Sequence, residues 1–263
     1  MSIKTIASIS GWVWVALLGV TFAGAQDFTV TARVALENGD RTAAEREAGN
    51  VVVWLTPAAG TAKPVAFRPA QPPRLVQKNK SFDPHVLVVP VSSVVAFPNH
   101  DPFFHNVFSL FEGRRFDLGL YEAGSTREVH FNKSGISYIF CNIHPEMSAV
   151  VVALDTPYYG VSDQHGQIVI ANVPAGRYTL RVWSESGLPE TLKTMTREVT
   201  VAENSSTLGV LRLSPGNLPA GHKNLYGRDY DPPNPDSPAY DRHLSPPLGV
   251  VQTSRFKAAT SVH

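Results

Sequence analysis

Cysteine is almost absent from this chain, which contains only Cys141. An internal disulfide is therefore excluded, and so is a small scaffold held together by disulfides. A strong charge of one sign is also absent, because 23 basic residues are matched by 22 acidic ones. A nucleic acid or an anionic membrane bound mainly by electrostatics is therefore not expected as a partner.

Sequence signatures of enzymes are lacking too. The chain has no His-x-His pair, which multicopper oxidases use to build a trinuclear cluster, and a binuclear copper centre would need a second cysteine. No Ser-His-Asp or paired-carboxylate arrangement stands out either. We therefore expect a protein that is not an enzyme.

A long apolar run occurs only at the N-terminus. Lys4 supplies a positive start, residues 11–23 are nearly all apolar or small, and Ala23-Gly24-Ala25 matches the small-x-small pattern of signal-peptidase sites. We expect residues 1–25 to be a signal peptide and the mature protein to be periplasmic or otherwise exported. An uncleaved anchor is the alternative, but the run is short for a bilayer span of ~20 residues.

Residues 26–213 have the pattern of strands almost throughout. Phe28 and Val30 alternate with polar residues, as in a half-buried strand, and residues 149–154 form a continuous apolar strand. A sustained 3.6-residue apolar period is missing, so helices should be few. Short strands separated by Gly, Pro and Asn turns predict an all-β fold of the sandwich type. Residues 214–263 hold eight of the 21 prolines and should form a largely disordered tail.

The segment Cys141-Asn142-Ile143-His144-Pro145-Glu146-Met147 places a thiolate, an imidazole and a thioether within one short stretch. Thiolate and imidazole make strong bonds to copper, and a weakly held axial sulfur tunes the reduction potential. Cys141 ends a predicted strand, and the other two donors lie in the loop that follows. One tight turn can therefore present all three donors to a metal.

A trigonal site with two imidazoles and one thiolate needs a second histidine. His105 is the best candidate, because it follows the predicted strand that ends at Phe97, and Asn106 is expected to hydrogen-bond to the loop of Cys141 and brace it. His100 is the main rival, although its setting is typical of an exposed turn. The other histidines lack partners at ligand spacing and should have surface or packing roles: His85, His130, His165, His222, His243 and His263.

A plainer interpretation weighs against a metal site. A lone cysteine is usually a small buried hydrophobe, and a nearby histidine is more often a surface residue than a ligand. Here a methionine at a suitable offset, an upstream His-Asn pair, an all-β context and export coincide, and together they favour a metal. Zinc also accepts cysteine and histidine, but it would not exploit the thioether.

Residues ~80–154 resemble the cupredoxin family, and the short Cys-x-x-His-Pro-x-Met loop is most similar to that of amicyanin. The resemblance implies a Greek-key β-sandwich with one type 1 (blue) copper. The implied ligands are His105, Cys141, His144 and Met147. Ser137 departs from the family pattern, because an aromatic residue is more usual there, and this departure concerns packing rather than ligation.

The part of the chain after residue 155 resembles the carboxypeptidase regulatory-like (transthyretin-like) sandwich family. The matching segments are Asp163 to Gly166, Ile168, Asn172-Val173-Pro174-Ala175-Gly176 and Tyr178-Thr179-Leu180, and the family's first two strands resemble residues 28–34 and 51–55. We expect Trp183 and Tyr178 to belong to the core of this sandwich rather than to a sugar-binding surface.

Together the two resemblances imply a particular domain order. Residues 27–57 and 155–213 would form the carboxypeptidase regulatory-like sandwich, and the cupredoxin domain, residues 74–154, would be inserted within it. The signal peptide (1–25) and the Pro-rich tail (214–263) would flank them. A simple tandem arrangement of the two domains is the alternative.

The cupredoxin resemblance implies a periplasmic carrier of single electrons. Its redox partner would be a protein such as a c-type cytochrome or a quinoprotein dehydrogenase. An exposed edge of His144 is the expected exit for the electron, with Pro145, Phe103 and Phe104 as an apolar docking patch or, alternatively, as loop packing. A copper- or zinc-binding carrier without electron transfer is the second hypothesis.

Overall fold

The computed structural model describes residues 26–36, 48–58, 67–69, 71–110, 113–214, 216 and 222–230. In these ranges the chain consists of strands and one short helix, α2 (Pro189–Thr194), so the all-β prediction is confirmed. No helix within the same ranges is long and apolar enough to cross a bilayer. The expected signal peptide, residues 1–25, lies outside the described residues.

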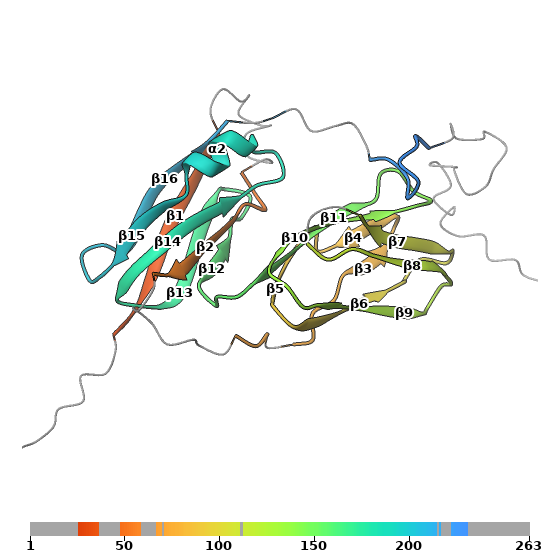
Figure 1. Cartoon of the computed structure of the whole chain (residues 1–263), viewed down its shortest axis with the longest axis horizontal. Helices are drawn as coiled ribbons and strands as arrows, with labels where there is room; N and C mark the ends of the chain where they lie inside the picture. Colours follow the sequence, from red (N-terminus) through yellow and green to blue (C-terminus); the bar gives the residue numbers. More distant parts are fainter. Residues whose placement is uncertain are drawn as a thin grey trace, which may run out of the picture.

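One sandwich, which we call the outer sandwich, combines strands from both ends of the described chain (Figure 1). Its strands are β1 (Asp27–Leu36), β2 (Val52–Pro57), β12 (Tyr159–Val161), β13 (Gln167–Pro174), β14 (Gly176–Trp183), β15 (Arg197–Val201) and β16 (Thr207–Leu213). One sheet has the order β13-β1-β16 and the other the order β12-β2-β14-β15. In β1, Val30, Ala32 and Val34 are buried while the residues between them are exposed, as the alternation predicts.

The other sandwich, which we call the metal sandwich, lies between β2 and β12 in the chain. Its strands are β3 (Val76–Lys78), β4 (Ser81–Asp83), β5 (Val86–Pro90), β6 (Ser93–Pro98), β7 (His105–Ser109), β8 (Phe116–Tyr121), β9 (Thr126–Phe131), β10 (Gly135–Cys141) and β11 (Ser148–Leu154). A five-stranded sheet of order β5-β11-β10-β7-β8 packs on the β6-β9 and β3-β4 pairs. The strands that carry the candidate ligands therefore lie in one sheet.

Strand pairing joins β1 and β2 to strands that come after the metal sandwich. β1 pairs with β13 and β16, and β2 pairs with β12 and β14. The chain therefore leaves the outer sandwich after β2 and returns to it at β12. Membership of the outer sandwich in the carboxypeptidase regulatory-like family stays a prediction.

The five-stranded sheet is apolar on both faces at β11. Ala149, Val151 and Ala153 point into the core of the metal sandwich, whereas Val150 and Val152 pack in a separate cluster with residues of the outer sandwich. That cluster also contains residues of both sandwiches: Val52, Val86, Leu154 and Trp183. Burial on both faces explains why residues 149–154 form a continuous apolar run.

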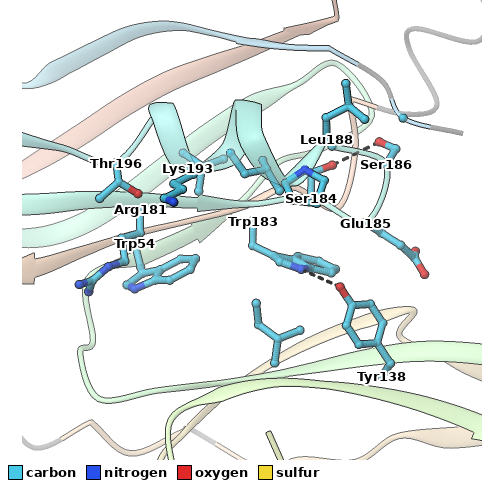
Figure 2. Close-up of a pocket in the computed structure, with 16 residues that line it drawn as sticks. Trp54, Tyr138, Arg181, Trp183, Ser184, Glu185, Ser186, Leu188, Lys193 and Thr196 are labelled. Carbon is cyan, nitrogen blue, oxygen red and sulfur yellow. Dashed lines mark hydrogen bonds between the residues drawn. The ribbon is translucent and has the colours of Figure 1, made fainter. Parts of the chain in front are cut away.

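A pocket of about 590 Å³ lies beside this cluster and takes its walls from both sandwiches (Figure 2). Trp54 and Trp183 come from the outer sandwich, and Ile136 and Tyr138 come from β10. The indole N–H of Trp183 donates to the Tyr138 hydroxyl at 3.4 Å. Tyr178 is buried in the core of the outer sandwich as expected, whereas Trp183 is buried in the cluster shared by the two sandwiches and lines this pocket.

His85 and Glu185 connect the two sandwiches with a pH-dependent contact. His85 Nε2 lies 2.6 Å from Glu185 Oε2, and this hydrogen bond raises the pKa of His85 above its ordinary 6.5 although burial opposes the shift. The contact therefore stabilises the fold fully below the unfolded pKa of about 6.5, and that stabilisation is lost as the pH rises through the raised folded pKa. Because both side chains are partly exposed, we expect its contribution to stay below about 1 kcal/mol.

Urea denaturation at about pH 5.5 and about pH 8 measures this contribution. The wild-type chain should lose more stability between the two pH values than Glu185→Gln does, because the variant lacks the charge that raises the His85 pKa. Glu203→Gln, which removes an exposed carboxylate of the outer sandwich, is the matched control and should behave like the wild type. An identical pH dependence in all three proteins would contradict the assignment.

Candidate metal centre

Three candidate ligands predicted from the sequence meet in the metal sandwich. One ligand atom each of His105, Cys141 and His144 lies within 4.8 Å of the others, and all three residues are buried. The Nδ1 atoms of both histidines lie 3.6 Å from the Cys141 sulfur. His105 begins β7, Cys141 ends β10, and His144 lies in the loop between β10 and β11.

Met147 is brought back to Cys141 by a tight turn. The N–H of Met147 donates to the carbonyl of His144 at 3.1 Å, and the N–H of Cys141 donates to the carbonyl of Met147 at 3.2 Å. The Met147 side chain is fully buried in the same core cluster as Cys141. The turn therefore returns the backbone of Met147 to Cys141, and its role as a ligand stays a prediction.

Asn106 braces the Cys141 loop, but through its backbone rather than its side chain. Its carbonyl accepts the N–H of Asn142 at 2.8 Å, and its own N–H is directed at the Cys141 sulfur. The Asn106 side chain instead donates to Asp117 at 2.7 Å. The expected hydrogen bond from Asn106 to the Cys141 loop is therefore present, and the main chain makes it because β7 lies next to β10.

Asp101 holds His105 from the side opposite the sulfur. Its Oδ2 lies 2.9 Å from His105 Nε2, and both side chains are almost fully buried. This bond keeps the proton on Nε2, so the lone pair of Nδ1 points to Cys141. The backbone N–H groups of Asn79 and Lys80, both at positive φ in the turn between β3 and β4, also donate to the carboxylate.

Burial sets the protonation of the three groups. Burial, together with the neighbouring His105 and Lys80, lowers the pKa of His144 to about 4. Burial also lowers the pKa of His105, although Asp101 acts against it, and burial raises the pKa of the Cys141 thiol. At neutral pH both imidazoles are therefore neutral and ready to donate a lone pair, whereas the sulfur keeps its proton until a cation replaces it.

Exposure distinguishes the residues around the site. His100, the rival ligand, is exposed and is not part of the cluster. His144 is only 5% exposed, so the expectation of an exposed imidazole edge was wrong. The Phe103 ring lies 5.4 Å from the rings of both His105 and His144, and Phe104 next to it is 52% exposed. The phenyl groups, not the imidazole, form the surface at this point.

Ser137 occupies its unusual position because the chain around Gly113 leaves no room for a larger side chain. The hydroxyl of Ser137 accepts the N–H of Arg114 at 2.8 Å, and a Cβ on Gly113 would meet that hydroxyl at 2.5 Å. Gly113 also has a φ of +83°, which favours glycine. A larger side chain at position 137 would therefore meet the backbone of Gly113.

Comparisons with known proteins give partial likenesses. No protein-family model matches the sequence, and no curated protein matches it. The structural neighbours are cupredoxins over part of the chain. A purple cupredoxin from Nitrosopumilus maritimus is 21% identical, with 31% of this chain and 99% of that one covered and a TM-score of 0.29.

Two further neighbours contain copper by their descriptions. A copper-containing nitrite reductase from Thermus scotoductus SA-01 is 24% identical over 46% of this chain and 28% of that one, with a TM-score of 0.31. A reduced Cu(I) form of an amicyanin variant is 16% identical over 39% of this chain and 98% of that one, with a TM-score of 0.30. Since these scores and identities are low, the metal assignment depends on the geometry of the site.

Replacing Asp101 by asparagine tests its role without any metal. Asp101→Asn keeps the shape of the side chain but replaces one acceptor oxygen by an N–H₂ group. The three groups that donate to the carboxylate, the N–H groups of Asn79, Lys80 and the His105 ring, then share a single acceptor oxygen. We expect the free energy of unfolding of the metal-free protein, measured with urea, to fall by about 1–3 kcal/mol. Asp155→Asn, at an exposed position directly after β11, should change it by no more than about 0.5 kcal/mol. Equal losses of stability in the two variants would show that the hydrogen bonds of the buried Asp101 carboxylate do not stabilise the site.

Proton release on metal binding tests the protonation states. Because the two imidazoles are neutral and the thiol is protonated at neutral pH, binding of Zn²⁺ should release about one proton, from Cys141. Calorimetry in two buffers of different ionisation enthalpy measures this number, and Cys141→Ser should release about none. Release of about two protons or more would mean that a histidine is charged in the metal-free protein.

Proposed function

We propose that this chain is an exported type 1 copper protein that carries single electrons between redox partners. The observation that supports it is the buried meeting of one cysteine sulfur with two histidine Nδ1 atoms, each 3.6 Å away, with Met147 returned to the same turn. Two nitrogens and one thiolate with a thioether nearby are the donor set that copper electron-transfer sites use. Export rests on the N-terminal pattern of residues 1–25.

The donor set fits copper better than zinc. Three strong donors meet at a single point, and the fourth candidate, the thioether of Met147, is a soft donor that zinc does not use. Copper, when bound, would supply a one-electron couple between Cu(I) and Cu(II). His105, Cys141, His144 and Met147 would hold it.

The protein's own residues keep the donors in place. Asp101 fixes the ring of His105, and the β7–β10 contact fixes Cys141 through the carbonyl of Asn106. The N–H groups directed at the sulfur come from Asn106, Ile143 and His144, and they favour the thiolate. Donors held by sheet hydrogen bonds and core packing need to move little when the charge at the site changes, which suits electron transfer.

The surface near His144 fits a transient redox protein. Phe103 packs against the His144 ring, Phe104 is half exposed, and Pro145, which follows His144, is partly buried. A small apolar patch of this kind suits short-lived docking. The proposed partner is a c-type cytochrome or a quinoprotein dehydrogenase. The alternative function is a copper or zinc carrier without electron transfer, and a closed, buried site favours it less.

Adding Cu(II) to the full chain tests the proposal directly. We expect an intense visible thiolate-to-copper absorption band and the EPR signal of a type 1 site, both removed by one-electron reduction and restored by oxidation. Cys141→Ser should lack the band because it lacks the thiolate. A colourless protein that binds copper weakly would refute the electron-transfer proposal and favour a metal-free or zinc-binding role.

A further inference from the structure

Residues 222–230, which we call the strap, lie against the metal sandwich although they belong to a segment expected to be largely disordered. Figure 1 shows them in blue beside the end of the sheet that carries β7 and β11. The strap is closed on itself: the N–H of Asn224 donates to the carbonyl of Arg228 at 2.8 Å, and the N–H of Gly227 donates to the carbonyl of Asn224 at 2.9 Å. Lys223 and Asp229 form an ion pair across it.

The strap bonds directly to the residues that begin the ligand loop. The hydroxyl of Tyr230 donates to the carbonyl of Cys141 at 2.7 Å. The N–H of Leu225 donates to the side-chain oxygen of Asn142 at 2.8 Å. Two separate points of the strap therefore contact two successive residues of the metal site.

Aromatic packing holds the same segment in place. The ring of His222 stacks on Phe140 with a centroid distance of 4.3 Å and meets the edge of Phe108 at 6.3 Å. Tyr230 packs edge-on against His222 at 5.3 Å. Phe140 points away from the core that contains Cys141, and the strap covers it on the outer face of the sheet. This cover contributes to the burial of Phe108 on the outer face of β7.

The peptide group between Cys141 and Asn142 is consequently held from both sides. Its carbonyl accepts the Tyr230 hydroxyl, and its N–H donates to the Asn106 carbonyl at 2.8 Å. Asn106 directly follows the candidate ligand His105. Hydrogen bonds at the two ends of one peptide group strengthen each other. The chain of bonds thus runs from the strap through the Cys141 peptide to the strand of His105.

We propose that the strap is a positioning element of the metal centre, with Tyr230 as its main contact. It fixes the Cys141 peptide, and through it the place of the sulfur relative to His105. The proposal rests on the proposed copper function for its effect on redox properties. Its effect on the Cys141 loop does not depend on a metal. An experiment can therefore refute the copper function without refuting the positioning role of the strap, and the reverse.

Tyr230→Phe in the full chain tests the proposal, because it removes one hydroxyl and keeps the ring that packs on His222. Tyr226→Phe removes the same group from the exposed tip of the strap, where the side chain is 75% exposed, and is the matched control. We expect Tyr230→Phe to lose copper to a chelator about fivefold faster, as the loss of one partly buried hydrogen bond implies. Its reduction potential and thiolate-to-copper band should shift, and those of Tyr226→Phe should not.

A metal-free measurement keeps the test independent of copper. Hydrogen exchange at the Asn142 amide should be faster in Tyr230→Phe than in Tyr226→Phe, because the hold on its peptide group is weaker. If a chain fails to show a copper band at all, the copper function is refuted, and this exchange rate alone decides the role of the strap. Asn142→Ala, which removes the acceptor for Leu225, is the second variant should Tyr230→Phe not fold.

Two results would overturn the proposal. In the copper-loaded chain, Tyr230→Phe and Tyr226→Phe could show the same rate of copper loss, the same reduction potential and the same thiolate-to-copper band. That result would mean that the strap only covers the sheet. In the metal-free chain, equal exchange at Asn142 in the two variants would do the same. A difference confined to Tyr230→Phe supports the assignment in either form of the protein.

Discussion

The contact between β7 and β10 is the constraint on which the metal centre depends. It brings His105 to Cys141 from a distant part of the sequence, because Cys141 lies opposite Val107 and the Asn142 N–H reaches the Asn106 carbonyl. Side chains of a strand alternate between two faces, so a register shift of one residue would turn Cys141 to the outer face and Phe140 into the core. The correct register, set by core packing, is therefore also a condition for binding the metal.

Local patterns in the sequence carried much of this result. Alternation located most strands, and Cys141, His144 and Met147 are close enough in sequence for one turn to explain them. Asp101 was missed because its role depends on the turn between β3 and β4, which has no apolar pattern, although a carboxylate four residues before a candidate ligand was a usable signal. The strap was missed because its contacts with Phe140 and Cys141 are long-range and its own sequence has no periodicity.

Side-chain exposure was the other property that the sequence did not predict. Whether His144 reaches the surface depends on where Phe103 packs, and whether Asn106 uses its side chain depends on how close β7 and β10 lie. Both are decided by neighbours distant in sequence. The burial of apolar residues on the outer face of the five-stranded sheet also depends on segments distant in sequence. The outer sandwich covers these residues at one end of the sheet, and the strap covers them at the other.

The pairing of β1 and β2 with later strands has a consequence for the order of folding. During synthesis these two strands emerge before the metal sandwich, yet their partners β12, β13, β14 and β16 begin only at residue 159. All strands of the metal sandwich are present before then, and domains generally fold as units once complete. The contacts of the outer sandwich join residues far apart in sequence, which makes its closure the slower step. The outer sandwich therefore completes its two sheets only after the metal sandwich between β2 and β12 has folded.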